Sequence, residues 1–143
     1  MDLLLGGTLA NLVSLGGGLV IMQISDPELT LDGQDGSGFE TDGSLGVVTL
    51  GPFVDVFFGP HSGGHAGGMI GLGSIGLEDE AGGASDGVGV AMFGGYDWWV
   101  SDQWAVGVNA RYLYVRAERD LGTIGTVTDT AHTFGVMFTA RYH

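Results

Sequence analysis

Five polar residues could do chemistry because they interrupt segments that otherwise carry no charge. They are Asp55, Asp97, Asn109, Arg111 and Arg141. A charged group within an apolar segment is costly to bury unless a group of opposite charge pairs with it. We therefore expect the two arginines to form ion pairs with the two aspartates in one polar network. The spacing leaves open which aspartate meets which arginine.

Metal binding is only weakly indicated. His61 and His65 share a short Gly-rich turn without a nearby acidic residue, so they do not resemble a zinc ligand set. The stretch 32–40 combines carboxylates with glycines, but Gly36 occupies the fifth position, where an EF-hand loop needs an oxygen ligand. Cysteine is absent, which removes disulfides and thiolate chemistry. We expect no metal and no cofactor.

Catalysis has one weak candidate. His132 lies beside Thr133 and near Asp129, a spacing that would permit a dyad. The sequence has no serine in a strained strand-to-helix turn and no second matching group. We therefore expect no enzymatic activity and place His132 on the surface of a strand, at an interface.

Composition narrows the class of protein. The chain has 143 residues, which fits one domain, and 29 of them are glycine. Its formal net charge is −13, with 17 acidic residues against four arginines. Nothing could neutralise a row of phosphates, so nucleic-acid binding is excluded, as is a polybasic membrane-surface mode.

The elements that must position these residues are strands, and the last one is the clearest. Between residues 130 and 142 every second residue is apolar or aromatic, and the alternate residues are small or polar. A strand of this length with two such faces suits a tilted crossing of a bilayer, which takes about 9–11 residues. The apolar face is His132, Phe134, Val136, Phe138, Ala140 and Tyr142.

Long acidic connections alternate with short turns along the chain. We expect external loops at 26–43, 78–86 and 118–129, and short turns near residues 59–64 and 100–103. This alternation is typical of an up-and-down membrane barrel. The expected strands between them cover residues 44–58, 65–77, 87–99, 104–117 and 130–142.

Aromatic residues gather beside the short turns. Aromatic girdles of this kind lie at membrane interfaces, because the rings are amphipathic. In a soluble sandwich the same residues would anchor the core. The expected girdle is Tyr96, Trp98, Trp99, Trp104 and Tyr142.

The segment 94–108 resembles the penultimate hairpin of small Gram-negative outer-membrane barrels of the OmpA, OmpX and OmpW kind. It carries a Gly-aromatic strand, the turn sequence Trp-Trp-Val-Ser-Asp-Gln-Trp and an alternating strand with Gly and Val. The alternation from Phe134 to Tyr142 resembles the signal that the barrel-assembly machinery reads, although His143 is the last residue. The resemblance covers residues 44–143 and implies eight strands and membrane insertion, without a particular activity.

The first 25 residues are harder to assign. Residues 3–23 carry no charge, a length that permits a membrane helix, but Gly6, Gly7 and the glycines at 16–18 disfavour one. A signal-peptide remnant is a further alternative, although Asp2 replaces the basic start. We expect β structure, with Leu3 to Val13 as a strand, followed by a hairpin through residues 14–18 or a bulged continuation. Eight-stranded relatives would then need one further hairpin before Met1.

The predicted protein is therefore one all-β domain spanning residues 1–143, an antiparallel up-and-down transmembrane β-barrel with six to eight strands. We expect a structural or surface-interaction role in the outer membrane, with side chains filling the lumen because eight strands leave room for little else. The expected partners are membrane lipid, lipopolysaccharide and the barrel-assembly machinery, and further copies of the chain if the barrel is incomplete. There are two alternatives. One is a narrow channel for small solutes, and the other is a soluble Gly-rich β-sandwich or lipocalin-like binder with its aromatic faces inside.

Overall fold

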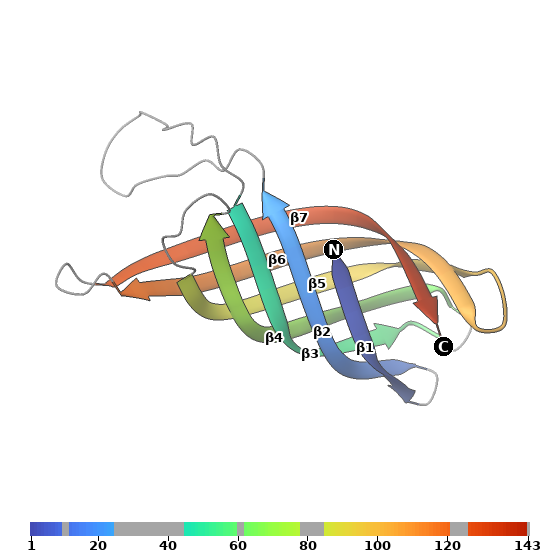
Figure 1. Ribbon diagram of the computed structural model, residues 1–143. Helices are drawn as coiled ribbons and strands as arrows, with labels where there is room; N and C mark the ends of the chain where they lie inside the picture. The colour runs from blue at the N-terminus through green and yellow to red at the C-terminus, as the bar shows by residue number, and fades with distance from the viewer. Residues whose placement is uncertain (10–11, 25–44, 60–61, 78–84, 121–125, 143) are drawn as a thin grey trace.

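Seven strands form one antiparallel sheet in the computed structural model, and each strand pairs with the next one along the chain (Figure 1). The structure describes residues 1–9, 12–24, 45–59, 62–77, 85–120 and 126–142. None of these residues forms a helix long and apolar enough to cross a membrane. The prediction of an all-β, up-and-down antiparallel fold is confirmed. The strands are β1 (Asp2–Leu9), β2 (Val13–Ile24), β3 (Leu45–Phe57), β4 (Gly64–Leu77), β5 (Ser85–Trp99), β6 (Trp104–Asp120) and β7 (Thr126–Tyr142).

The sheet curls strongly but does not close. Its strand order runs from β1 to β7 without a ladder between these two strands, which are the edges of the described sheet. The curl brings the two edges of the sheet towards each other. A Cβ atom at Gly135 of β7 would lie 3.4 Å from the terminal methyl of Met22 in β2. We call the concave side the inner face and the convex side the outer face.

The five strands expected from residue 44 onward are present, but two expected loops are shorter than predicted. The prediction of a loop over 118–129 is wrong, since β6 and β7 extend into it and Ala117 pairs with Asp129. The reason is that the two-residue alternation continues: Ala117 is buried on the inner face while Arg116 and Glu118 point outward. The loop predicted at 78–86 also ends earlier, because β5 begins at Ser85. The loop 26–43, the calcium-like stretch 32–40 and His61 lie outside the described residues.

The N-terminal region forms a hairpin whose turn differs from the expected one. The Leu12 amide donates a hydrogen bond to the Leu9 carbonyl at 3.1 Å, and β2 begins one residue later. A turn through residues 14–18 is therefore wrong. Gly16 instead allows β1 and β2 to approach closely. It pairs with Gly6, and a Cβ at Gly16 would collide with the backbone of β1.

Side-chain facing alternates along β3, β5, β6 and β7, as a two-residue period predicts. By that period Trp99 would share the inner face with Asp97, but it is 44% exposed at the end of β5, within the expected aromatic girdle. The facing of β4, which its many glycines left undecided, places His65, Met69 and Ile75 inside. Apolar side chains from successive strands pack there into a core with Val20, Val47, Phe53, Leu113 and Val115 among its members.

Leu113 tests whether the inner face is a packed core. Replacing Leu113, which is fully buried, by Ala should lower the free energy of unfolding by about 2–5 kcal/mol, because it leaves a cavity. Leu72→Ala is the matched control, since Leu72 is 76% exposed on the outer face of β4. Urea unfolding followed by tryptophan fluorescence measures both, and equal losses would contradict this description of the core.

Candidate functional site

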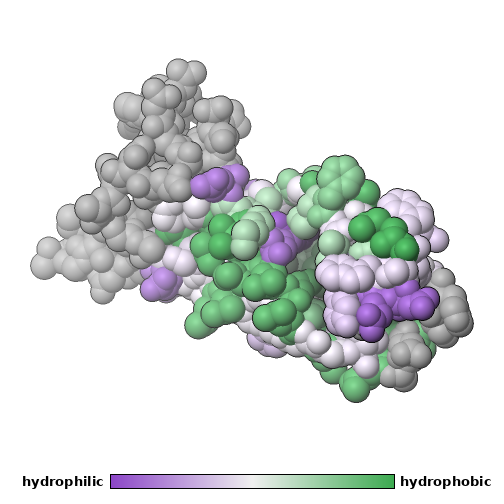
Figure 2. Space-filling view, turned by 45° about the vertical axis from the view of Figure 1, so that its right-hand side comes forward, coloured by the Kyte–Doolittle hydropathy of each residue, from purple (hydrophilic) through white to green (hydrophobic). Residues whose placement is uncertain are grey.

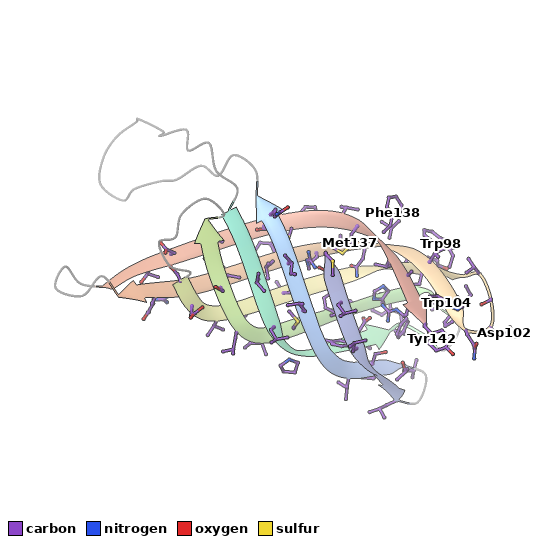
Figure 3. The ribbon with its side chains drawn as sticks, in the orientation of Figure 1. Trp98, Asp102, Trp104, Met137, Phe138 and Tyr142 are labelled. Atoms are coloured by element: carbon purple, nitrogen blue, oxygen red, sulfur yellow. The ribbon has the colours of Figure 1, made fainter. Side chains whose placement is uncertain are left out.

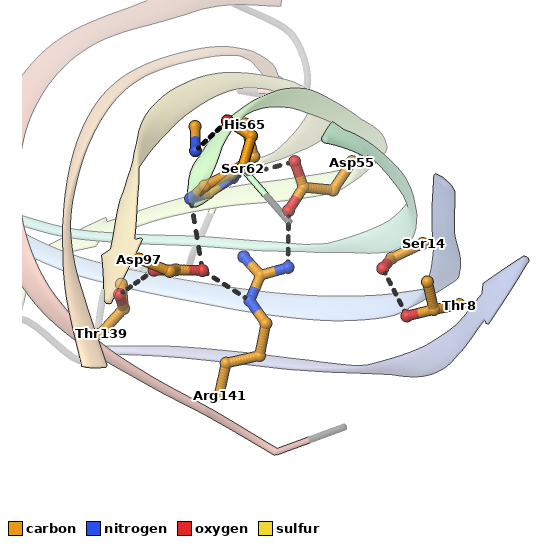
Figure 4. A network of polar contacts seen from close by, with 9 residues as sticks. Thr8, Ser14, Asp55, Ser62, His65, Asp97, Thr139 and Arg141 are labelled. Carbon is orange, nitrogen blue, oxygen red and sulfur yellow. Dashed lines mark hydrogen bonds and ion pairs between the residues drawn. The ribbon is translucent and has the colours of Figure 1, made fainter. Parts of the chain in front are cut away.

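One polar cluster on the inner face joins side chains of β3, β4, β5 and β7 (Figure 4). The Arg141 guanidinium donates a hydrogen bond from one terminal nitrogen to Asp55 Oδ2 at 2.9 Å, and its Nε lies 3.0 Å from Asp97 Oδ2. The His65 ring lies between the same two carboxylates, with Nδ1 3.0 Å from Asp55 and Nε2 3.7 Å from Asp97. We call Asp55, His65, Asp97, Thr139 and Arg141 the inner polar cluster.

The strand register explains why these residues meet. Asp55 pairs with Gly67 on β4, and His65 pairs with Gly95 on β5, so the imidazole lies between the carboxylates of the flanking strands. Arg141 belongs to the edge strand β7 and reaches them across the interior. Its guanidinium carbon also lies 4.8 Å from the centre of the Phe57 ring, a cation–π contact.

Gly107 of β6 leaves the space that one carboxylate occupies. A Cβ atom at this position would collide with Asp97 Oδ1 and would lie 2.9 Å from the Thr139 hydroxyl. That hydroxyl donates a hydrogen bond to the same carboxylate oxygen at 3.1 Å. Glycine on the inner face of β6 is therefore required by the packing of the cluster, as expected where bulky groups crowd a narrow interior.

A second ion pair crosses the interior between β1 and β6. Arg111 donates to Asp2, and the arginine side chain is almost fully buried. The prediction that Arg111 pairs with Asp55 or Asp97 is wrong. Arg111 pairs in register with Phe93, four residues before Asp97 and roughly 13 Å from it along the strand. Asn109 is buried on the same face of β6, and its carbonyl oxygen has no hydrogen-bond partner among the described residues.

Three contributors to these networks escaped the sequence analysis. His65 was considered only with His61 as a metal ligand, because the glycines of β4 obscure its alternation. Asp2 looked like a departure from a signal peptide, yet it is the partner of Arg111. Thr139 lay on the correct inner face, but only the curl of the sheet shows that it contacts Asp97. Two-residue periodicity continued through β4 would have placed His65 inside.

The side chains considered as metal ligands or as a catalytic dyad are not brought together among the described residues. Within the described ranges no group of three histidine or acidic side chains is placed to hold a metal ion. The two nitrogens of His65 face different carboxylates and do not converge on one point. His132 contacts the Tyr112 hydroxyl on the outer face, whereas Thr133 points inward, so these neighbours do not form the dyad that their spacing would permit.

The expected aromatic girdle lies on the outer face beside the short turns. Trp98, Trp104 and Tyr142 stand together at this end of the sheet (Figure 3). The Trp104 and Tyr142 rings are 5.3 Å apart, and Tyr96 and Trp98 are 5.1 Å apart. All of these rings are about half exposed.

A second outward aromatic group, which the sequence analysis did not identify, lies nearer the long connections. The Tyr112 hydroxyl is 2.6 Å from His132 Nδ1, and the Tyr114 ring centre is 4.9 Å from that of His132. Trp104 and Tyr114 are about ten residues apart on β6, which corresponds to about 25 Å across a bilayer for a strand tilted by ~45°.

Large apolar side chains cover the outer face between the two aromatic groups. Phe138 is the extreme case, 92% exposed and pointing away from the sheet (Figure 3). Apolar residues gather over the middle of the face shown in Figure 2, with hydrophilic residues towards its ends. We call this surface the outer apolar band; it includes Leu50, Val54, Ile70, Leu72, Val88, Met92, Phe134, Val136 and Phe138.

Comparison with protein-family models, with curated proteins and with solved structures found no match to this chain.

Arg141 tests the inner polar cluster. Arg141→Met should lower the free energy of unfolding by about 3–5 kcal/mol, because two buried carboxylates lose their shared guanidinium. Arg116→Met is the matched control. The Arg116 side chain is 59% exposed and forms a long, 3.9 Å ion pair with Glu118, so its loss should change the free energy of unfolding little. The unfolding midpoints of the two variants measure this difference. An Arg141→Met variant as stable as the parent would contradict the assignment of Arg141 to the inner polar cluster.

Gly107 provides an independent test of the same cluster. Gly107→Ala should lower the unfolding midpoint, because the added methyl group displaces the Asp97 carboxylate and the Thr139 hydroxyl. Gly17→Ala serves as control, since a Cβ at Gly17 meets no atom within 4 Å. Thermal unfolding followed by circular dichroism gives both midpoints, and a tolerated Gly107→Ala would show that the carboxylate does not need this space.

Proposed function

We propose that this protein is an outer-membrane β-barrel protein with a structural or surface-interaction role and an interior filled by side chains. The observation that carries the proposal is the inverted distribution of polarity: the outer apolar band faces away from the sheet, and the ion pairs lie inside. Soluble proteins rarely expose continuous apolar surface on this scale. In a bilayer the same band would contact lipid.

The dimensions of the outer face support this proposal. The two aromatic groups are separated by about 25 Å, which is the height of the apolar band between the girdles of outer-membrane barrels. Tyrosine and tryptophan favour such interfaces because one part of the ring system is apolar and another part forms hydrogen bonds. The soluble alternative would need these aromatic and valine faces inside, whereas Trp98, Trp104 and Val106 are about half exposed.

A filled interior favours a structural role over a channel. Val47, Leu113 and Val115 are fully buried on the inner face, and the inner polar cluster occupies the end near the short turns. Planar-bilayer recording should therefore show no stepwise conductance for the parent chain or for Arg141→Met. Lipid is the partner that this surface fits, and lipopolysaccharide and the barrel-assembly machinery follow from the family resemblance as parts of the same proposal.

Refolding tests the proposal directly. We expect the urea-solubilised chain to fold only when detergent micelles or vesicles are present, with a β circular dichroism spectrum and a gel mobility that changes on boiling. Folding in plain buffer, without a heat-dependent shift, would contradict membrane insertion and favour the soluble binder.

Val136 lies in the middle of the outer apolar band on β7 and is 65% exposed. Val136→Arg should reduce stability in vesicles by about 2–4 kcal/mol, because the charge would face the centre of the bilayer. Thr130→Arg is the matched control on the same strand and face, beyond the second aromatic group, and should be tolerated. Unfolding in vesicles measures both, and equal effects would argue against a lipid-facing band.

A further inference from the structure

We propose that the outer face binds one phospholipid whose headgroup is a phosphate monoester. Arg116 and His132 bind the phosphate, and one acyl chain of the same lipid lies in a groove over Gly68. The inference rests on the proposed function, because it needs the outer face to contact lipid. It deepens that function by naming the chemistry of the lipid and the residues that select it.

Two outward basic side chains lie next to each other near the long connections. Among the arginine and histidine side chains that the structure describes, only Arg116 and His132 point outward. Arg116 pairs in register with Thr130, which lies two residues before His132 on the same face of β7. Diagonal neighbours of this kind are about 7–8 Å apart, so one small anion can contact both side chains.

The Arg116 guanidinium has donors available for such an anion. Its side chain is 59% exposed, and its ion pair with Glu118 is 3.9 Å long, which exceeds the length of a hydrogen bond. A guanidinium group binds two oxygens of a phosphate through parallel hydrogen bonds.

Two tyrosines hold the His132 ring in place. The Tyr112 hydroxyl lies 2.6 Å from His132 Nδ1, and the Tyr114 ring centre is 4.9 Å from the centre of the imidazole. When Tyr112 donates to Nδ1, a neutral imidazole carries its proton on Nε2, which becomes a donor. Arg116 and His132 then serve three oxygens. A phosphate monoester has three terminal oxygens and a diester has two, so the monoester fits this donor set.

The depth of Arg116 also suits a lipid phosphate. Tyr114 belongs to the second outward aromatic group, which marks one boundary of the outer apolar band. Arg116 follows two residues further along β6, about 5 Å along the bilayer normal for a strand tilted by ~45°. The headgroup layer extends roughly 5–7 Å beyond the hydrocarbon core on each side, so Arg116 lies within it.

A shallow apolar groove of about 420 Å³ runs along β4 on the outer face. Gly68 forms its floor, because this residue has no side chain and pairs with Val54 on one side and Met92 on the other. Ile70 and Val90 also line the groove. Its volume falls within the range of about 300–1,000 Å³ that is typical of small-molecule sites.

Strand tilt places this groove beneath the phosphate site. One row of residues paired in register runs through Tyr112, Met92, Gly68, Val54, Leu15 and Gly7. Tyr112 is eight residues from the start of β6 at a short turn, whereas Gly7 is two residues from the end of β1 at another. Such rows therefore descend towards the short turns from β6 to β1. A line along the bilayer normal from Tyr114 crosses β5 and reaches β4 near Gly68.

The total charge of the chain does not explain an affinity for an anionic lipid. The formal net charge of −13 repels anionic headgroups. Asp86 and Glu118 pair in register just beyond Arg116, towards the long connections, and add local repulsion. A preference for an anionic lipid would therefore come from the local donors of Arg116 and His132.

The first test measures lipid binding by the chain refolded in neutral detergent micelles. Native mass spectrometry compares dioleoyl phosphatidic acid, a monoester, with dioleoyl phosphatidylglycerol, a diester. We expect tighter binding of the monoester, and Arg116→Gln should weaken it about five- to tenfold. His132→Phe keeps the ring contact with Tyr114 and should also weaken binding of phosphatidic acid, without affecting phosphatidylglycerol. Equal affinity of the parent for both lipids would overturn the proposal.

A pair of charge variants separates the local site from total charge. Glu118→Gln should strengthen binding of phosphatidic acid, because it removes repulsion beside Arg116. Asp102→Asn makes the same change in net charge at the exposed short turn between β5 and β6 and should have no effect. Equal effects of the two variants would show a response to total charge and would overturn the proposal.

The groove is tested by filling it. Gly68→Val should weaken binding of dioleoyl phosphatidic acid, and Gly68→Ala replaces it if the larger side chain prevents folding. Gly17→Val is the matched control on the outer face of β2, where a Cβ atom meets nothing within 4 Å. Unchanged binding by the Gly68 variant, or displacement of the lipid by millimolar inorganic phosphate, would overturn the assignment of an acyl chain to the groove.

The heat-dependent gel shift of every variant separates this inference from the proposed function. A chain that shows the shift but does not distinguish the two lipids would overturn the lipid site alone. A parent chain without the shift would overturn the proposed function, and the lipid site with it.

Discussion

The rest of this structure depends on one constraint: the guanidinium of Arg141 is held within the interior and must be paired there. Arg141 lies on an edge strand, and the carboxylates that it contacts belong to β3 and β5. These contacts can form only if the sheet curls until β7 faces the middle strands. The Asp2–Arg111 pair acts in the same way from the opposite edge. Curvature and charge pairing therefore stabilise each other.

The inner face divides into two regions with different roles. Near the short turns, His65 and Arg141 both contact two aspartates, and the glycines of neighbouring strands provide the space. Towards the long connections the filling is apolar, with Val47 and Val115 fully buried. Because the polar groups are concentrated inside, the outer face is free to be almost wholly apolar. That division is the basis of the proposed lipid environment.

The two edge strands of the described sheet, β1 and β7, have no ladder between them. An antiparallel sheet with an odd number of strands cannot close without one parallel pair, and the polar atoms that lack partners include groups on β1, β6 and β7 beside the opening. The unpaired backbone edges and the polar side-chain atoms without partners therefore lie in the same part of the described sheet.

The sequence by itself determined the strands, their alternation and the outer face. Two-residue periodicity fixed the inward or outward position of residues such as Asp97 and Phe138, because successive side chains of a strand point to opposite faces. Periodicity failed where glycine removes the signal, as in β4 and at residues 16–18, which lie within β2 and not in a turn. The tertiary structure alone decided that Arg141 contacts both aspartates, that Arg111 binds Asp2, and that His65 joins the cluster. Those contacts depend on register and on the curl of the whole sheet, and a local pattern in the chain specifies neither.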